Sequence, residues 1–112
     1  MPIENWSDNI LVAQLQDDPS FSDDLTALFD RIESRNDTDV VLNFSGVDYL
    51  NSSNIAKLLK LRKKLVSINR RLVLCGIKTN AWGLFLVTGL DKVFEFADDV
   101  ANGLASVQIT NG

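Results

Sequence analysis

Short apolar runs alternate with longer amphipathic segments along most of this chain. The runs near residues 9–15, 39–44, 71–76 and 93–96 are rich in Val, Ile, Leu and Phe, as β-strands are. After each run, apolar residues recur at spacings of three and four, which places them on one face of a helix. This order favours an α/β fold with a mixed, mainly parallel sheet of about four strands packed against about four helices.

The longest helix is expected to run from Ser52 or Ser53 to about Asn69, and three further helices are expected to begin near residues 22, 79 and 98. In the last of these, Gly103 is expected to cost about 1 kcal/mol relative to Ala. The helical spacing places the following residues on the buried stripe of the longest helix: Ile55, Leu58, Leu59, Arg62, Leu65, Val66 and Asn69. The candidate buried positions of the helix near residue 79 are Ala81, Leu84, Phe85 and Val87.

The length and composition indicate one domain over residues 1–112. The chain has 112 residues, of which 46% are hydrophobic, and this is enough for one core. No apolar run is long enough to span a membrane, and the first residues lack the apolar segment of a secretory signal. We therefore expect a cytoplasmic protein without direct membrane insertion. Cys75 lies in an apolar run, which favours a buried, reduced thiol.

The residue types exclude several kinds of chemistry. The chain has no histidine, so Ser-His-Asp and Cys-His arrangements are impossible. It has one cysteine, no Gly-rich phosphate loop and no motif with paired carboxylates, so we expect no enzyme activity, no cofactor and no metal site. The net charge of -4 argues against nucleic acid as a partner.

The charges are distributed unevenly along the chain. Seven of the 11 basic residues fall between Lys57 and Arg71, whereas the first 48 residues hold 11 of the 15 acidic ones. This pattern fits two solvated helix faces. It also fits a bipolar surface that orients a protein partner.

A pair of serines, Ser52 and Ser53, stands where the second strand-like run gives way to the longest helix. Backbone N–H groups at a helix start lack partners, and the helix dipole is positive there. A serine hydroxyl at this place either caps the helix or offers a position for a phosphate. In a parallel sheet the junction lies at the carboxyl edge of the strands, where ligands and partners commonly bind.

The sequence around this junction resembles the STAS domain, the fold of bacterial anti-sigma factor antagonists. The resemblance covers about residues 38–108. The family has a hydrophobic strand, an Asp-Ser-Ser/Thr-Gly motif and a long helix, then a strand, a helix that ends in Gly-Leu, and a short final strand. The matching segments here are Asp39–Ile55, Leu72–Ile77, Thr88–Leu90 and Val93–Phe96.

The resemblance implies a phosphorylation site. In that family an anti-sigma kinase phosphorylates the first hydroxyl residue of the motif, which corresponds to Ser52, and Ser53 matches the neighbouring hydroxyl. Two residues depart from the motif, because Asn51 replaces the usual Asp and Asn54 replaces the usual Gly. The N-terminal part also departs from the family, since only one clear strand precedes the first helix instead of two.

The expected partner is an anti-sigma factor or a serine kinase-like switch protein, and the sequence leaves the oligomeric state open. For Trp82 the alternative to partner binding is ordinary packing in the core. For Lys57 the alternative is a solvated side chain on an exposed helix face. The candidate partner-binding residues are Asp48, Asn51, Ser52, Ser53, Asn54, Lys57 and Trp82.

Three functions follow from these patterns. The first is a regulatory binding module, involved in bacterial transcription regulation and signal transduction, that a kinase controls through Ser52. The second is a cytoplasmic accessory subunit of a membrane transporter, without phosphorylation, because STAS-like domains also occur there. The third is a small-molecule binding or hydrolytic domain, which the missing histidine disfavours.

Overall fold

The computed structural model describes residues 3–111 and contains one five-stranded sheet. The strands follow one another across the sheet in the order β1-β2-β3-β4-β5. β1 is antiparallel to β2, and the remaining neighbours are parallel. The elements are β1 (Ile3–Ser7), β2 (Ile10–Gln16), α1 (Ser20–Ser34), β3 (Asp39–Gly46), α2 (Ser52–Ser67), β4 (Leu72–Cys75), α3 (Thr79–Thr88), the 3-10 helix η1 (Leu90–Lys92), β5 (Glu95–Ala97) and α4 (Val100–Asn111).

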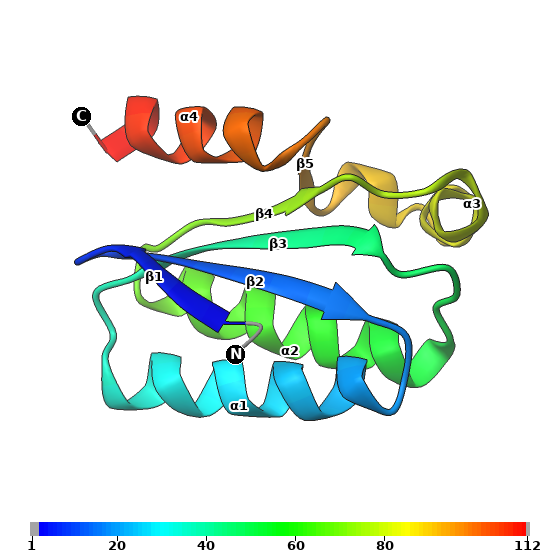
Figure 1. Ribbon diagram of the computed structural model, residues 1–112, viewed down its shortest axis with the longest axis horizontal. Helices are drawn as coiled ribbons and strands as arrows, with labels where there is room; N and C mark the ends of the chain where they lie inside the picture. The colour runs from blue at the N-terminus through cyan, green and yellow to red at the C-terminus, as the bar shows by residue number, and fades with distance from the viewer. Residues whose placement is uncertain (1–2, 112) are drawn as a thin grey trace.

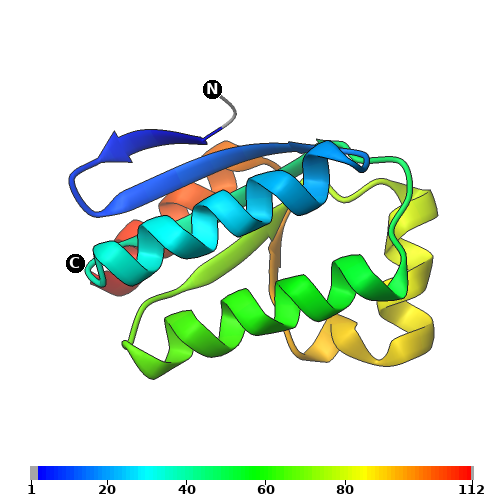
Figure 2. The same ribbon diagram turned by 90° about the horizontal axis from the view of Figure 1, so that it is seen from below.

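The helices form unequal layers on the two faces of the sheet. α1 and α2 lie side by side on one face, and α4 covers part of the other (Figures 1 and 2). α3 lies beyond the carboxyl ends of the parallel strands, next to the segment that leads into α2 (Figure 2). This edge therefore brings together the segments that follow β2, β3 and β4.

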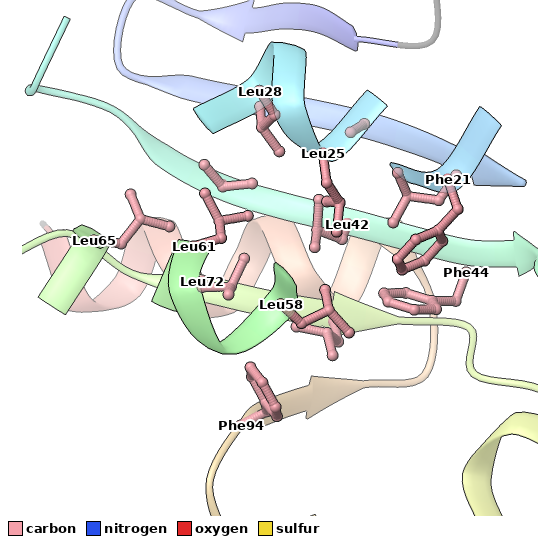
Figure 3. Packing of buried hydrophobic residues seen from close by; sticks show 14 of the residues in the cluster. Phe21, Leu25, Leu28, Leu42, Phe44, Leu58, Leu61, Leu65, Leu72 and Phe94 are labelled. Atoms are coloured by element: carbon pink, nitrogen blue, oxygen red, sulfur yellow. The ribbon is translucent and has the colours of Figure 1, made fainter. Parts of the chain in front are cut away.

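The larger core fills the space between the sheet and the pair α1 and α2. Figure 3 shows Leu25 and Leu28 of α1, Leu42 of β3, and Leu58 and Leu61 of α2 among the side chains of this cluster. A smaller cluster on the opposite face joins the β2, β3 and β4 side chains to α4. Its buried members are Ile10, Val12, Val41, Val73, Cys75, Leu104 and Val107.

The mixed, mainly parallel α/β architecture predicted from the sequence is confirmed, and the sheet has one strand more than the sequence indicated. β1 pairs with β2, so two strands precede the first helix and the expectation of a single one was wrong. β1 is an edge strand in which Ile3 is buried while Glu4, Asn5 and Trp6 are exposed. The pattern therefore lacks the apolar alternation by which a half-buried strand is recognised.

The buried stripe of α2 is rotated relative to the prediction. Leu61 is 1% exposed, whereas Leu59 and Val66, which were expected on the stripe, are 37% and 55% exposed. In α3, Val87 was also expected to be buried but is exposed. Spacings of three and four fit more than one face of a helix rich in apolar residues, so the position of the sheet decides between them.

Gly103 allows α4 to approach the sheet closely. A Cβ atom added there would lie 2.5 Å from Cys75 Sγ and 3.1 Å from Val41 Cγ1. Helix propensity alone predicts only a cost for this glycine, but the packing requires its small size. Cys75 is buried beneath it as expected, and burial raises the pKa of its thiol to about 11.

A charged network holds the amino-terminal edge of the parallel strands. Asp39, at the start of β3, is fully buried and accepts hydrogen bonds from Arg71 N at 2.8 Å and Arg70 Nη2 at 2.9 Å. Arg71 also pairs with Glu95 of β5 and donates to the backbone oxygen of Ser106 in α4. The network therefore joins β3, β4, β5 and α4.

Candidate functional site

The segment between β3 and α2 lies at the carboxyl edge of the sheet, as the sequence predicted for the serine pair (Figure 2). On one side it meets the turn between β2 and α1, and on the other it meets the start of α3. Val47 anchors the segment because its side chain is fully buried. Tyr49, two residues later, is 74% exposed.

Asn51 caps α2. Its side-chain Oδ1 accepts from the backbone N–H of Asn54 at 2.9 Å, and the Asn54 side-chain Oδ1 accepts from the backbone N–H of Asn51 at 3.0 Å. This is a reciprocal capping box, which satisfies two backbone donors that the helix itself leaves unpaired. The two residues that depart from the family motif thus form one structural unit.

The serines therefore do not cap the helix, and that interpretation of them was wrong. Ser52 and Ser53 are the first two residues of α2, and both are exposed. Within residues 3–111, neither hydroxyl has a hydrogen-bond partner, and neither do the two backbone N–H groups. The helix start thus presents two hydroxyls and two unpaired donors to solvent.

Two aspartates in the turn after β2 fix the shape of this segment. Asp17 Oδ1 accepts from the backbone N–H groups of Asp48 at 2.8 Å and Tyr49 at 3.1 Å. Asp18 Oδ2 accepts from Asn54 Nδ2 at 2.7 Å, so the side chain of Asn54 is buried with both ends paired. The loop and the capping box are thereby tied to a neighbouring strand.

The environment of Asp18 favours its charged form. The hydrogen bond from Asn54 lowers the pKa of this carboxyl most, followed by the hydrogen bonds from Ser22. The nearby positive charge of Lys57 also lowers that pKa. Lys57 is therefore close enough to the turn to act on its charge, although Asp18 is exposed.

An ion pair connects the loop to α3. Lys78 Nζ, at the N-cap of α3, lies 2.8 Å from Asp48 Oδ1. The side chains are 46% and 50% exposed, so the pair contributes little to stability. It joins the side chain of Asp48 to the start of α3.

Trp82 belongs to a different cluster. It is half-buried and contacts Phe96 edge-on, with ring centroids 4.9 Å apart, and it also lies against Phe85. It lines a hollow of about 340 Å³ together with Ile77 and Phe96. These contacts fit the packing alternative, and a role for Trp82 in partner binding stays a prediction.

The sequence reading missed three residues of this edge. Asp17 and Asp18 were not among the candidate residues, although each holds part of the loop. Their partners lie 31 to 36 residues away in the chain, so no local pattern reveals them. Tyr49 was detectable, because an aromatic residue in a polar loop is a common binding contact.

A family model for the STAS domain matches residues 8–103. The chain belongs to the STAS domain family. The match begins before the segment in which the sequence resemblance was found, and it includes α1 and the first turn of α4.

Three solved structures illustrate the likeness of the STAS chain to proteins of known fold. A serine-to-glutamate variant of RsbS from Moorella thermoacetica superposes with a TM-score of 0.84 at 19% identity, covering 98% of this chain and 96% of that one. The phosphorylated form of the Bacillus cell fate determinant SpoIIAA gives 0.71 at 16%, covering 94% and 96%. A sulfate transporter family protein from Wolinella succinogenes gives 0.72 at 16%, covering 90% and 84%. At these identities the likeness establishes the shared fold.

No curated protein matches the chain. Among residues 3–111, no helix is both long enough and apolar enough to cross a membrane. In the same residues, no group of three or more His, Cys, Asp or Glu side chains is arranged to hold a metal ion.

Proposed function

We propose that this STAS domain is a regulatory, non-enzymatic protein-binding module of the anti-sigma factor antagonist type. Its partner is an anti-sigma factor or a related serine kinase, which binds the loop at residues 48–54 and the first turns of α2. Phosphorylation of Ser52 weakens this binding.

The observation that carries the proposal is the division of roles at the start of α2. Asn51 and Asn54 cap the helix, so the exposed hydroxyl of Ser52 has no structural task. A phosphate at this position carries nearly two negative charges beside a positive helix end, where the fold tolerates it. A partner surface that packs on the neutral hydroxyl meets that charge directly. A hundredfold loss of affinity requires only about 2.8 kcal/mol.

The surroundings of Ser52 support a surface that is rigid before the partner arrives. Asp17 holds two backbone N–H groups of the loop, and Asp18 holds the side chain of Asn54. A preformed surface loses less conformational entropy on binding than a mobile one. Tyr49 supplies an exposed aromatic ring of the kind that dominates binding energy at interfaces.

The proposal is tested by incubating the protein with ATP, Mg²⁺ and each anti-sigma kinase-like protein encoded near its gene, and then measuring its intact mass. We expect the mass of one phosphate in the wild type and in Ser53→Ala, and none in Ser52→Ala. Ser53→Ala is the matched control, because Ser53 is the adjacent exposed hydroxyl on the same helix turn. No mass gain in the wild type, together with unchanged binding of Ser52→Asp, would contradict the proposal.

The second candidate is an accessory subunit of a membrane transporter, in which Ser52 is not modified. The observation that favours it is the fold shared with a sulfate transporter family protein. The two candidates differ in their genomic surroundings, because the first expects a kinase-like gene nearby and the second expects transporter genes. They also differ in the result for Ser52→Asp, which weakens partner binding only in the first.

A further inference from the structure

A groove of about 580 Å³ separates α1 from α2 and opens to solvent. Leu25, Phe29 and Ala56 provide its apolar surface, and Ser53 lines it where α2 begins. The groove therefore starts beside Ser52 and follows α2 for about two turns.

The two walls of the groove carry opposite charges. Asp30 and Glu33 line the α1 side, and Lys57 and Lys60 line the α2 side. Within residues 3–111, none of these four side chains takes part in an ion pair. Lys60 Nζ instead lies 4.5 Å from the centroid of the Phe29 ring. The carboxylates of the α1 wall and the ammonium groups of the α2 wall are thus not neutralised by ion pairs with one another.

The backbone of the walls decides which kind of segment fits. Both walls are helices, whose internal hydrogen bonds leave no row of backbone donors and acceptors for an added strand. A helix needs no such row, because it binds through apolar side chains spaced three and four apart.

We propose that this groove receives an amphipathic helix of the partner that binds the Ser52 loop. The helix places its apolar edge on Leu25, Phe29 and Ala56, its acidic side along α2 and its basic side along α1. The inference rests on the proposed function and names the chemistry of the partner segment. It also explains the effect of a phosphate on Ser52, which stands at the α2 end of the groove and repels the acidic side of that helix.

The central test measures the affinity of the kinase-like partner that phosphorylates Ser52, using isothermal titration calorimetry. Ala56→Trp fills the groove, and we expect it to lower affinity at least about tenfold. Ala27→Trp is the matched control, since Ala27 is an exposed alanine of α1 that does not line the groove. We expect this control to bind like the wild type.

Charge reversals test the orientation of the helix. Lys60→Glu is expected to weaken binding several-fold, while Lys92→Glu, an exposed lysine outside the groove, leaves binding unchanged. A photo-crosslinker at Thr26 in the groove is expected to capture a partner segment with helical apolar spacing and acidic residues along one side.

The outcomes separate this inference from the proposed function. If Ser52→Glu weakens binding but Ala56→Trp and Ala27→Trp bind alike, the groove proposal is wrong and the function stands. Capture of a second copy of this chain by the crosslinker also overturns the groove proposal. If no kinase-like protein binds or phosphorylates the wild type, the proposed function fails and the groove proposal fails with it.

Discussion

The two edges of the sheet both use aspartates to hold backbone N–H groups, but in opposite surroundings. At the amino-terminal edge, Asp39 is fully buried and accepts hydrogen bonds from the Arg70 guanidinium and from the backbone N–H of Arg71. At the carboxyl edge, Asp18 is exposed and Asp17 is half-buried, and they hold a loop and a helix cap. The same chemical group thus serves the stability of the sheet at one edge and the shape of a surface at the other.

The difference follows from solvation. Removing either member of a buried ion pair leaves the other member as an uncompensated charge in a medium of low polarity. An exposed carboxylate is replaced by water at small cost. We therefore expect changes at the amino-terminal edge to affect unfolding most, and changes at the carboxyl edge to affect mainly the proposed binding surface.

The largest effect is expected for Asp39→Ala. This change leaves Arg70 and the backbone N–H of Arg71 without their buried acceptor, and we expect a loss of about 3–5 kcal/mol in the free energy of unfolding. Urea denaturation monitored by tryptophan fluorescence measures it. Asp37→Ala serves as control, because the ion pair of Asp37 with Arg35 is exposed and its loss is expected to cost less than about 1 kcal/mol. Equal losses for the two variants would remove the contrast between the edges.

An intermediate effect is expected for Asn54→Ala. The variant loses the hydrogen bond to the backbone N–H of Asn51 and the one to Asp18, and we expect it to lose about 1–2 kcal/mol of stability. Ser52→Ala is the matched change in the same turn and is expected to stay within about 0.5 kcal/mol of the wild type. Thermal unfolding compares the two. A larger loss of stability for Ser52→Ala than for Asn54→Ala would indicate that the serine, and not the asparagine pair, caps the helix.

The smallest effect concerns the pH dependence of stability. The folded state lowers the pKa of Asp18, so its contribution is present above the unfolded pKa and is lost as pH falls through the folded one. Below about pH 4, we expect the stability of the wild type to fall more steeply than that of Asp18→Asn. Urea titrations at several pH values measure the two slopes, and identical slopes would mean that the contact between Asp18 and Asn54 does not form in solution.

The fold was predictable from the sequence because most of its signals are local. The strand-like runs that became β2, β3 and β4 are continuous and apolar, as expected for strands covered on both faces. Gly89 ends α3 with φ 74°, the left-handed conformation that glycine adopts readily. β1 escaped prediction because an edge strand with one buried residue has no such pattern.

The candidate site was predictable only in its position. The order of strand and helix placed Ser52 at the carboxyl edge of the sheet, and the structure has it there. The sequence did not reveal that Asn51, one residue earlier, is the cap. The side chain of Asn54, which completes the capping box with Asn51, is held by Asp18 from 36 residues away. Long-range contacts of this kind decide between local alternatives of nearly equal energy.

The departures from the family motif acquire a physical meaning through this cap. A glycine at position 54 lacks the side chain that pairs with Asn51 and with Asp18. This protein has Asn54 there instead, and both the oxygen and the nitrogen of its side-chain amide form hydrogen bonds. The two asparagines thus stabilise the helix start without using the serine hydroxyls.

The central claim is that the side chain of Ser52 does not stabilise the fold and that its phosphorylation controls partner binding. The most direct measurement is the affinity of the kinase-like partner for the protein carrying phosphoserine at position 52, introduced during synthesis, compared with the unmodified chain. We predict a loss of affinity of about a hundredfold with an unfolding midpoint that changes by no more than about 2 °C. Unchanged affinity, or a marked fall in the unfolding midpoint, would contradict the account.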